Sequence, residues 1–168
     1  MLEVNFPILV LAAIVPLLIG FIWYHPKVFG TAWMQAAGVI PDDKKEMNML
    51  KVFGLTFILS LMLAMLLMVL VIHQFSLFSV VADIVREPGD TSTPEGAWLK
   101  SAMDLYGTKF RTFKHGMFHG FIAGLFLFLP IVAVNGLFER KSAKYIFINT
   151  GFWTLCAMIM GGIICQFN

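Results

Sequence analysis

The chain has 168 residues and a net charge of +2, only 13% of its residues are charged, and its mean hydropathy is +0.83. Ordinary soluble domains carry about 25% charged residues. The chain also has four apolar segments that each exceed the roughly 20 residues needed to cross a bilayer, and a soluble domain of this size could not bury them all. This composition excludes the soluble globular, disordered and fibrous classes, indicates no nucleic-acid partner, and predicts an all-α, polytopic membrane protein. The stretches without Asp, Glu, Lys or Arg are Val4–Pro26, Val52–Ala82, His115–Phe138 and Tyr145–Asn168.

The first predicted span opens with Pro7, which suits a first helical turn. It closes at Trp23 and Tyr24, aromatic residues typical of the membrane–water interface. Because its N-terminal flank is acidic and no cleavage site of small residues follows, we expect it to stay in the membrane rather than to be a signal peptide. In the loop 27–51, apolar residues at helical spacing predict a short interfacial helix, and Asp42 is the expected N-cap of the second span. We expect one integral-membrane domain over 1–168, a four-helix bundle with spans at about 6–24, 50–74, 113–137 and 145–166.

The second uncharged stretch would extend about 46 Å as one helix, which exceeds the roughly 30 Å core of a bilayer. We therefore expect the helix to leave the membrane near His73-Gln74 and to continue along or beyond the interface. Residues 83–111 form the expected extramembrane loop. Within it, Thr93-Pro94-Glu95 has the pattern of an N-cap, a first-turn proline and a first-turn acid, so a short amphipathic helix ending near Gly107 should follow.

The third and fourth spans are separated only by residues 139–142, which predicts an antiparallel helical hairpin. Asn135 and Asn149 are the polar amides inside these two spans, near the same end, where they are placed to hydrogen-bond across the hairpin. Cys156 and Cys165 lie nine residues apart on the fourth span, about 13 Å of rise, so they cannot bridge to each other within one helix. We interpret both cysteines as small apolar residues.

The distribution of basic residues predicts the orientation of the spans. The first and third loops together hold seven Lys and Arg residues, whereas the longer second loop and its flanks hold five and also carry acids. Cytoplasmic loops carry the excess of basic residues. We therefore expect both termini on the outer side of the membrane.

Three motifs stand out along the chain: WYxPxxFGxxW over 23–33, HGxxHG over 115–120 and FERKS over 138–142. Asn149, Trp153 and Gly161 in the fourth span add to the pattern. Together they resemble an uncharacterised bacterial family of small four-helix integral membrane proteins, a domain of unknown function. The resemblance covers nearly the whole chain except 83–111 and implies a four-helix architecture in a bacterial inner (cytoplasmic) membrane. It implies no activity.

Three of the four histidines are expected at the same membrane level. His115 and His119 are four residues apart and share one helix face, and His73 lies at the outer end of the second span. Two imidazoles at this spacing can hold one metal ion, with His73 or an acid such as Asp104 as the third ligand. Haem binding and a structural role as hydrogen-bonded interfacial residues are the alternatives. His25 lies at the opposite face.

Gly116, Gly120 and Gly124 form a ladder of small residues on the third span, a pattern that lets two helix backbones approach closely. The ladder is centred about 120° from the histidine face, so one partner can pack on the glycines while the histidines face another. The packing partner is either another helix of the same chain or a second protomer.

No ionisable residue lies in the middle of a span, which argues against an ion-coupled transporter, and no catalytic triad or nucleotide-binding motif is present. The first functional hypothesis is therefore a non-enzymatic membrane subunit or scaffold that packs with itself or with another membrane protein. The second is a small membrane protein that binds a metal, haem or a lipid-like ligand at the outer-leaflet histidines. The third is a membrane enzyme that acts on a lipophilic substrate. The sequence identifies no particular cofactor.

Overall fold

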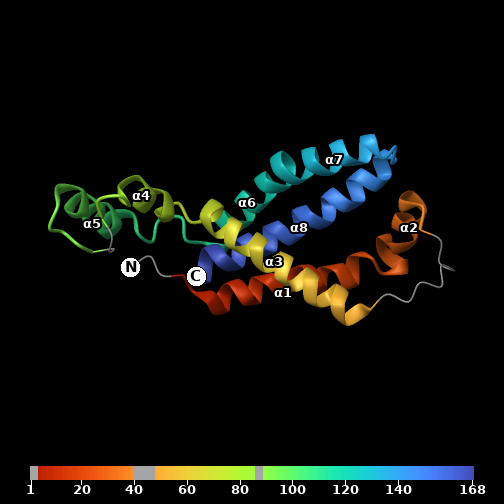
Figure 1. The fold of residues 1–168 in the computed structure, drawn as a ribbon, viewed down its shortest axis with the longest axis horizontal. Coiled ribbons are helices and arrows are strands. Elements are labelled where there is room, and N and C mark those ends of the chain that lie inside the picture. Colours follow the sequence, from red (N-terminus) through yellow and green to blue (C-terminus); the bar gives the residue numbers. More distant parts are fainter. Residues whose placement is uncertain (1–3, 40–47, 86–88) are drawn as a thin grey trace.

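The computed structural model describes residues 4–39, 48–85 and 89–168. All of the regular structure in these ranges is helical, which confirms the predicted all-α class. Two π-helical turns, Pro26–Gly30 and Gly124–Phe128, interrupt the α-helical structure. The second of these turns comes just before Pro130, whose missing N–H interrupts the regular hydrogen-bond pattern. In chain order the helices are α1 (Phe6–Trp23), α2 (Thr31–Ala37), α3 (Met49–Val71), α4 (Gln74–Val81), α5 (Pro94–Tyr106), α6 (Phe113–Ala123), α7 (Leu129–Phe138) and α8 (Ala143–Phe167) (Figure 1).

Within the described residues, four helical rods are long and apolar enough to cross a membrane: α1, α3, the continuous α6–α7 rod and α8. This confirms the expected number of span-length helices. The rods share the long axis of the molecule, while α4 and α5 project beyond them at one end and α2 lies at the other (Figure 1). The start of α1 and the end of α8 lie side by side, and the backbone N–H of Asn5 donates a 2.9 Å hydrogen bond to Oδ1 of Asn168 there.

Helix α8 is the central helix, although it is the least apolar of the four rods. Half of its span is buried, against 28% for α1 and for α3 and 17% for α6–α7. It packs on α1, α3 and α6, and it carries small buried residues such as Cys156 and Ala157 on the faces that these helices cover. The other three rods expose large apolar side chains such as Phe21, Met62 and Phe126, which is the pattern of lipid-facing helices.

The glycine ladder packs inside the chain, against α8. A Cβ atom placed on Gly116 would overlap the backbone of Gly161, and one on Gly120 would overlap the backbone of Ala157. A Cβ on Gly124 would overlap the side chain of Thr154. The structure therefore resolves the two alternatives in favour of an internal partner, with the α6 and α8 backbones in direct contact.

At the α2 end, an aromatic cluster closes the bundle around Asn149. The Oδ1 atom of Asn149 accepts hydrogen bonds from the Tyr24 hydroxyl at 3.1 Å and from Nε1 of Trp33 at 3.2 Å, and Trp23 donates to the Ile148 carbonyl at 3.2 Å. The amide nitrogen of Asn149 donates to Tyr145 within α8. The prediction that Asn149 bonds to Asn135 is therefore wrong, because the packing of α8 on α1 and α2 gives Asn149 closer partners.

The same end holds the FERKS turn. Nζ of Lys141 donates a 2.7 Å hydrogen bond to the carbonyl of Ala37, the last residue of α2, and the Ser142 hydroxyl caps α8. This contact ties the α7–α8 turn to α2. The predicted N-cap Asp42 lies outside the described residues; within them, the side chain of Asn48 caps α3 by accepting from the Lys51 N–H.

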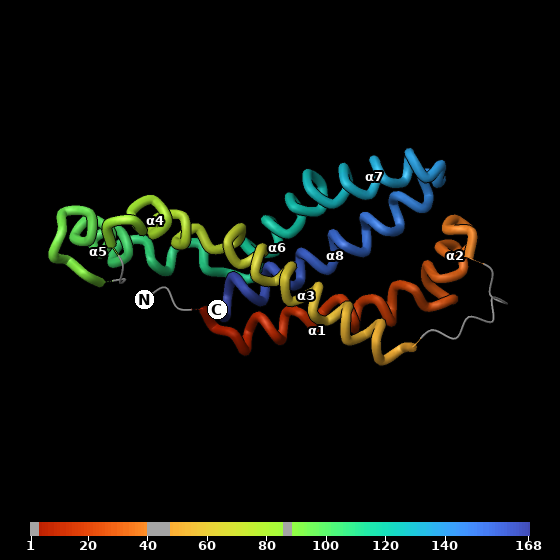
Figure 2. The backbone as a smooth tube through the Cα atoms, in the orientation of Figure 1, coloured from red at the N-terminus to blue at the C-terminus, as the bar shows by residue number. Residues whose placement is uncertain are grey.

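At the opposite end, α3 stops at Val71 and α4 starts at Gln74, so the helix breaks at the residues where the sequence analysis placed its exit from the membrane. Figure 2 shows the chain continuing from this break into the projecting α4–α5 unit. Helix α5 begins as predicted, with the Thr93 hydroxyl accepting from the Gly96 N–H and Pro94 in the first turn. It is capped at Gly107.

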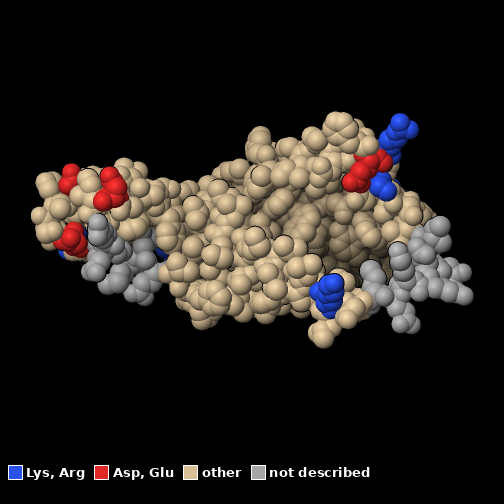
Figure 3. All heavy atoms as spheres, in the orientation of Figure 1, with Lys and Arg blue, Asp and Glu red and all other residues tan. Residues whose placement is uncertain are grey.

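Charged side chains gather at the two ends of the molecule. In the view of Figure 3, acidic atoms lie over the α4–α5 unit, both basic and acidic groups lie around the α7–α8 turn, a basic group lies at the start of α3, and the middle of the surface carries no charge. Such an uncharged middle zone is expected of a protein whose span-length helices sit in lipid.

Replacing Gly120 by Leu should destabilise the fold by more than about 3 kcal/mol, because the side chain would force the α6 and α8 backbones apart. Replacing Gly151 by Leu should cost less, about 1–3 kcal/mol, because its nearest neighbour is the movable ring of Trp23 at 3.1 Å. Gly54, which has nothing within 4 Å, provides the neutral control. Thermal unfolding in detergent measures the series, and an equal or larger loss for the Gly151 variant would contradict the packing argument.

Replacing Asn149 by Leu should lower the free energy of unfolding by about 1–3 kcal/mol, because Tyr24 and Trp33 lose their shared acceptor. The matched control is Asn135→Leu, which alters an exposed amide on α7. The unfolding temperatures of the two variants in the same detergent make the comparison. A larger effect at position 135 would show that the amide across the hairpin, and not the aromatic cluster, holds this end together.

Candidate metal centre

Two separate chain segments carry the three histidines to one place. His73 lies in the break between α3 and α4, directly after Ile72, whose extended backbone turns the chain. His115 and His119 occupy the first two turns of α6, whose N-cap Thr112 accepts a hydrogen bond from the His115 N–H. Both α6 and α3 pack on α8, and this packing brings the start of α6 next to the end of α3.

The three imidazoles are close enough to share one ion. Their candidate ligand nitrogens all lie within 4.8 Å of one another, and the two Nε2 atoms of His73 and His115 are 3.0 Å apart in a hydrogen bond. The ring centres of His73 and His119 are 4.8 Å apart, and those of His115 and His119 are 4.5 Å apart. His73 is exposed and the other two rings are half-buried, so the cluster is open to an ion from outside.

These separations suit a metal ion. Nitrogens bound tetrahedrally to zinc at about 2.0–2.1 Å from the metal are roughly 3.3 Å from one another, so small rotations of the rings would bring all three into ligand positions. The direct contact between His73 and His115 leaves no space for a porphyrin between them, which favours an ion over haem. Three protein ligands leave a fourth position for water or another ligand.

Phe110 supports the histidine cluster from the loop before α6. Its ring stacks on His115 at 5.0 Å between centroids and 18° between planes, and it meets His73 edge-on at 6.5 Å. The backbone of Phe110 has φ of 64°, a conformation that a bulky residue adopts only when its surroundings hold it there. The Cys165 thiol donates to the carbonyls of both Phe110 and Val71, at 3.3 and 3.4 Å, and so ties this loop to the end of α3.

A cleft of about 440 Å³ opens beside the cluster, between α4 and the end of α5, and His73 forms part of its wall. Gln74 also lines it and is 3% exposed. The Gln74 amide nitrogen donates to the carbonyls of Tyr106 and Lys109, at 2.8 and 3.0 Å, and holds that segment against α4. The Gln74 Oε1 atom accepts no hydrogen bond from the described residues.

The structure separates the other candidates from this site. Asp104, the alternative third ligand, pairs with Lys100 on α5 at 2.7 Å and does not belong to the cluster. His25 lies after α1, at the α2 end, where its Nδ1 accepts from the Lys27 N–H. Cys156 and Cys165 are free and buried.

Sequence reasoning missed Phe110, Gln74 and Lys109 as parts of this site. Phe110 and Lys109 lie in the expected extramembrane loop, where nothing in the residue pattern distinguishes them from other loop residues. Gln74 could have been found, because a polar residue at the end of a long apolar run usually has a buried partner.

The fold and the cluster together define a small all-α protein with four span-length apolar helices and three histidines grouped at one end. Residues 8–165 match a family described as "Protein of unknown function (DUF1761)". The chain belongs to this family, as its resemblance to an uncharacterised family predicted. The match includes all three histidines and the glycine ladder. No curated protein and no solved structure matches the chain.

Proposed function

We propose that this protein is an integral membrane protein that binds one divalent transition-metal ion through His73, His115 and His119. The observation that supports this function is the convergence of three imidazoles, from two segments 42 residues apart, to within 4.8 Å. A metal ion would replace the direct histidine contact by three coordinate bonds.

The chemistry of the cluster favours ions of the zinc, copper, nickel or iron group. Imidazole suits these metals, whereas magnesium and calcium prefer oxygen ligands. Neither a carboxylate nor a thiolate belongs to the cluster among the described residues. We propose metal binding as the role of the cluster.

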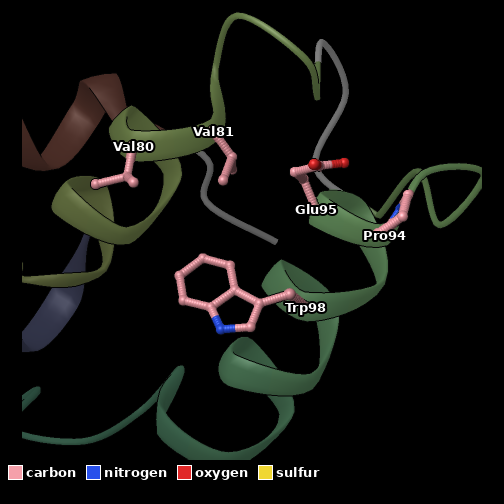
Figure 4. A pocket seen from close by; sticks show the side chains of 5 residues that line it. All are labelled: Val80, Val81, Pro94, Glu95 and Trp98. Carbon is pink, nitrogen blue, oxygen red and sulfur yellow. The ribbon is translucent and has the colours of Figure 1, made fainter.

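The subunit or scaffold hypothesis is supported by an exposed apolar groove on the α4–α5 unit and not by the histidines. The glycine faces on which it was based are covered by α8, which leaves the projecting α4–α5 unit as the candidate contact surface for a second copy or another membrane protein. A groove of about 330 Å³ lies there. In Figure 4 the Trp98 indole of α5 faces Val80 and Val81 of α4. Val80 is 74% exposed and Trp98 is 48% exposed, so the groove is apolar and accessible.

We also propose that the protein lies in the inner membrane of a bacterium with both termini and the α4–α5 unit outside. The support is the asymmetry of basic residues in the sequence, seven against five, together with the basic groups that lie around the α7–α8 turn and the start of α3 in the described part of the chain. This orientation would place the histidine cluster on the outer side, where it meets metal ions that have not entered the cell.

Metal binding can be measured directly on protein purified in a chelator-free detergent solution. We expect one zinc ion per chain, and we expect His73→Ala to weaken binding by at least about tenfold, since even outer-shell partners of metal ligands contribute 10–100-fold to affinity. Isothermal titration with zinc compares the variants.

The matched control is His25→Asn, which removes a histidine at the other end and keeps an acceptor for the Lys27 N–H. This variant should bind zinc as tightly as the natural chain. A stoichiometry of zero for the natural chain, or equal losses for the two variants, would refute the site.

Thiol labelling of intact cells tests the orientation. Ser92 and Ser142 are exposed and lie at opposite ends of the fold, and the two native cysteines are buried. A membrane-impermeant maleimide should label Ser92→Cys in intact cells and Ser142→Cys only after lysis. Labelling of position 142 from outside would reverse the topology.

A further inference from the structure

The cleft beside the histidine cluster has a charged wall that the metal site does not use. Lys109 lines it, with Nζ over the Tyr106 ring at 5.1 Å and over the Phe110 ring at 5.5 Å. Within the described residues the one ion pair is Lys100 with Asp104, so the Lys109 ammonium has no acidic partner there. A lysine ammonium without an acidic partner among the described residues, next to the proposed metal site, can attract an anion.

The position of the cleft in the fold indicates which anion it meets. His73 is the second residue after the end of α3, and Lys109 lies four residues before the start of α6. The cleft therefore begins where two span-length helices end, at the depth at which a bilayer presents its phosphate headgroups. Apolar and aromatic groups line the remaining wall, including Leu77 and Phe110.

Resting on the proposed metal function, we infer that the cleft binds the headgroup of a membrane phospholipid, with its phosphate between the metal ion and Lys109. Both partners are positive, so both attract a phosphodiester anion. Gln74 supplies a further preference. Gln74 lines the cleft and its buried Oε1 accepts no hydrogen bond from the described residues, so a small movement of the cleft wall that exposes this atom would give a ligand an acceptor. A headgroup that carries a hydroxyl donor, such as phosphatidylglycerol, fits better than one without a donor, such as phosphatidylcholine.

Cobalt-loaded protein in a maltoside detergent, which contains no phosphate, allows a direct test. Co²⁺ reports its ligands through visible absorption bands, and short-chain dihexanoyl phosphatidylglycerol is titrated against it. We expect the bands to shift, with an affinity about tenfold higher than for dihexanoyl phosphatidylcholine, as one additional hydrogen bond provides, and higher than for inorganic phosphate, which lacks the hydroxyl-bearing headgroup. Equal affinity for inorganic phosphate would identify a site for free anions and overturn the lipid assignment.

Two lysine variants separate the cleft from the metal site. Lys109→Gln should weaken phosphatidylglycerol binding by about tenfold and leave the Co²⁺ affinity unchanged. Lys114→Gln, an exposed position on α6 that does not line the cleft, should change neither. Normal Co²⁺ binding with no band shift, or a Lys109→Gln variant that binds the lipid normally, would overturn this inference and leave the proposed metal function standing.

Native mass spectrometry gives a readout that does not depend on the metal. Phosphatidylglycerol should remain bound to the natural chain and to Lys114→Gln, and it should be lost from Lys109→Gln. If Co²⁺ does not bind, the metal function fails. In that case, lipid retention that depends on Lys109 still supports the cleft, and retention that is equal in all three proteins overturns it.

Discussion

The rest of the structure depends on the direct approach of the α6 backbone to the α8 backbone. Glycines at 116 and 120 meet Gly161 and Ala157 with no side chain between them, so dispersion and weak hydrogen bonds act over a long, flat contact. This contact sets the rotation of α6 about its axis. Because His115 and His119 precede and adjoin these glycines, the same contact directs their imidazoles away from α8 and towards the end of α3.

The two ends of the fold differ in how their polar groups are paired. At the α2 end, Asn149 is shared by Tyr24 and Trp33, and Lys141 pairs with the Ala37 carbonyl. These bonds hold helices together. At the other end, one imidazole bonds to a second imidazole. The three imidazoles grouped there are the basis of the proposed metal site at the α4–α5 end.

The proposed metal site and the cleft depend on the same few hydrogen bonds. Gln74 fixes the segment that carries Lys109, and Cys165 fixes the backbone of Phe110. Arg111, next in the chain, donates to the carbonyls of Cys165 and Asn168 near the end of α8, where a cation also complements the helix dipole. The loop before α6 is thus held from α4 and from α8, which keeps the phenyl ring over His115 and the ammonium over the cleft.

Local physical rules are enough to predict the number of span-length helices, several helix ends and one shared helix face from the sequence. A backbone in lipid must satisfy its own hydrogen bonds, so four uncharged runs of sufficient length predict four helices. The Thr93-Pro94-Glu95 start of α5 and the break near His73 follow from capping and from span length in the same way. The i,i+4 spacing of His115 and His119 likewise predicts a shared face without any knowledge of the fold.

Only the tertiary structure decided which faces meet. Periodicity shows that α6 has a glycine face, but it does not show that α8 covers it. The hairpin connection predicted Asn135 as the partner of Asn149, whereas the actual partners, Tyr24 and Trp33, are more than 100 residues away. The same holds for Phe110 and Lys109, which gain their roles only from neighbours on other helices. A contact between distant segments depends on how whole helices pack, and no short pattern of residues contains that information.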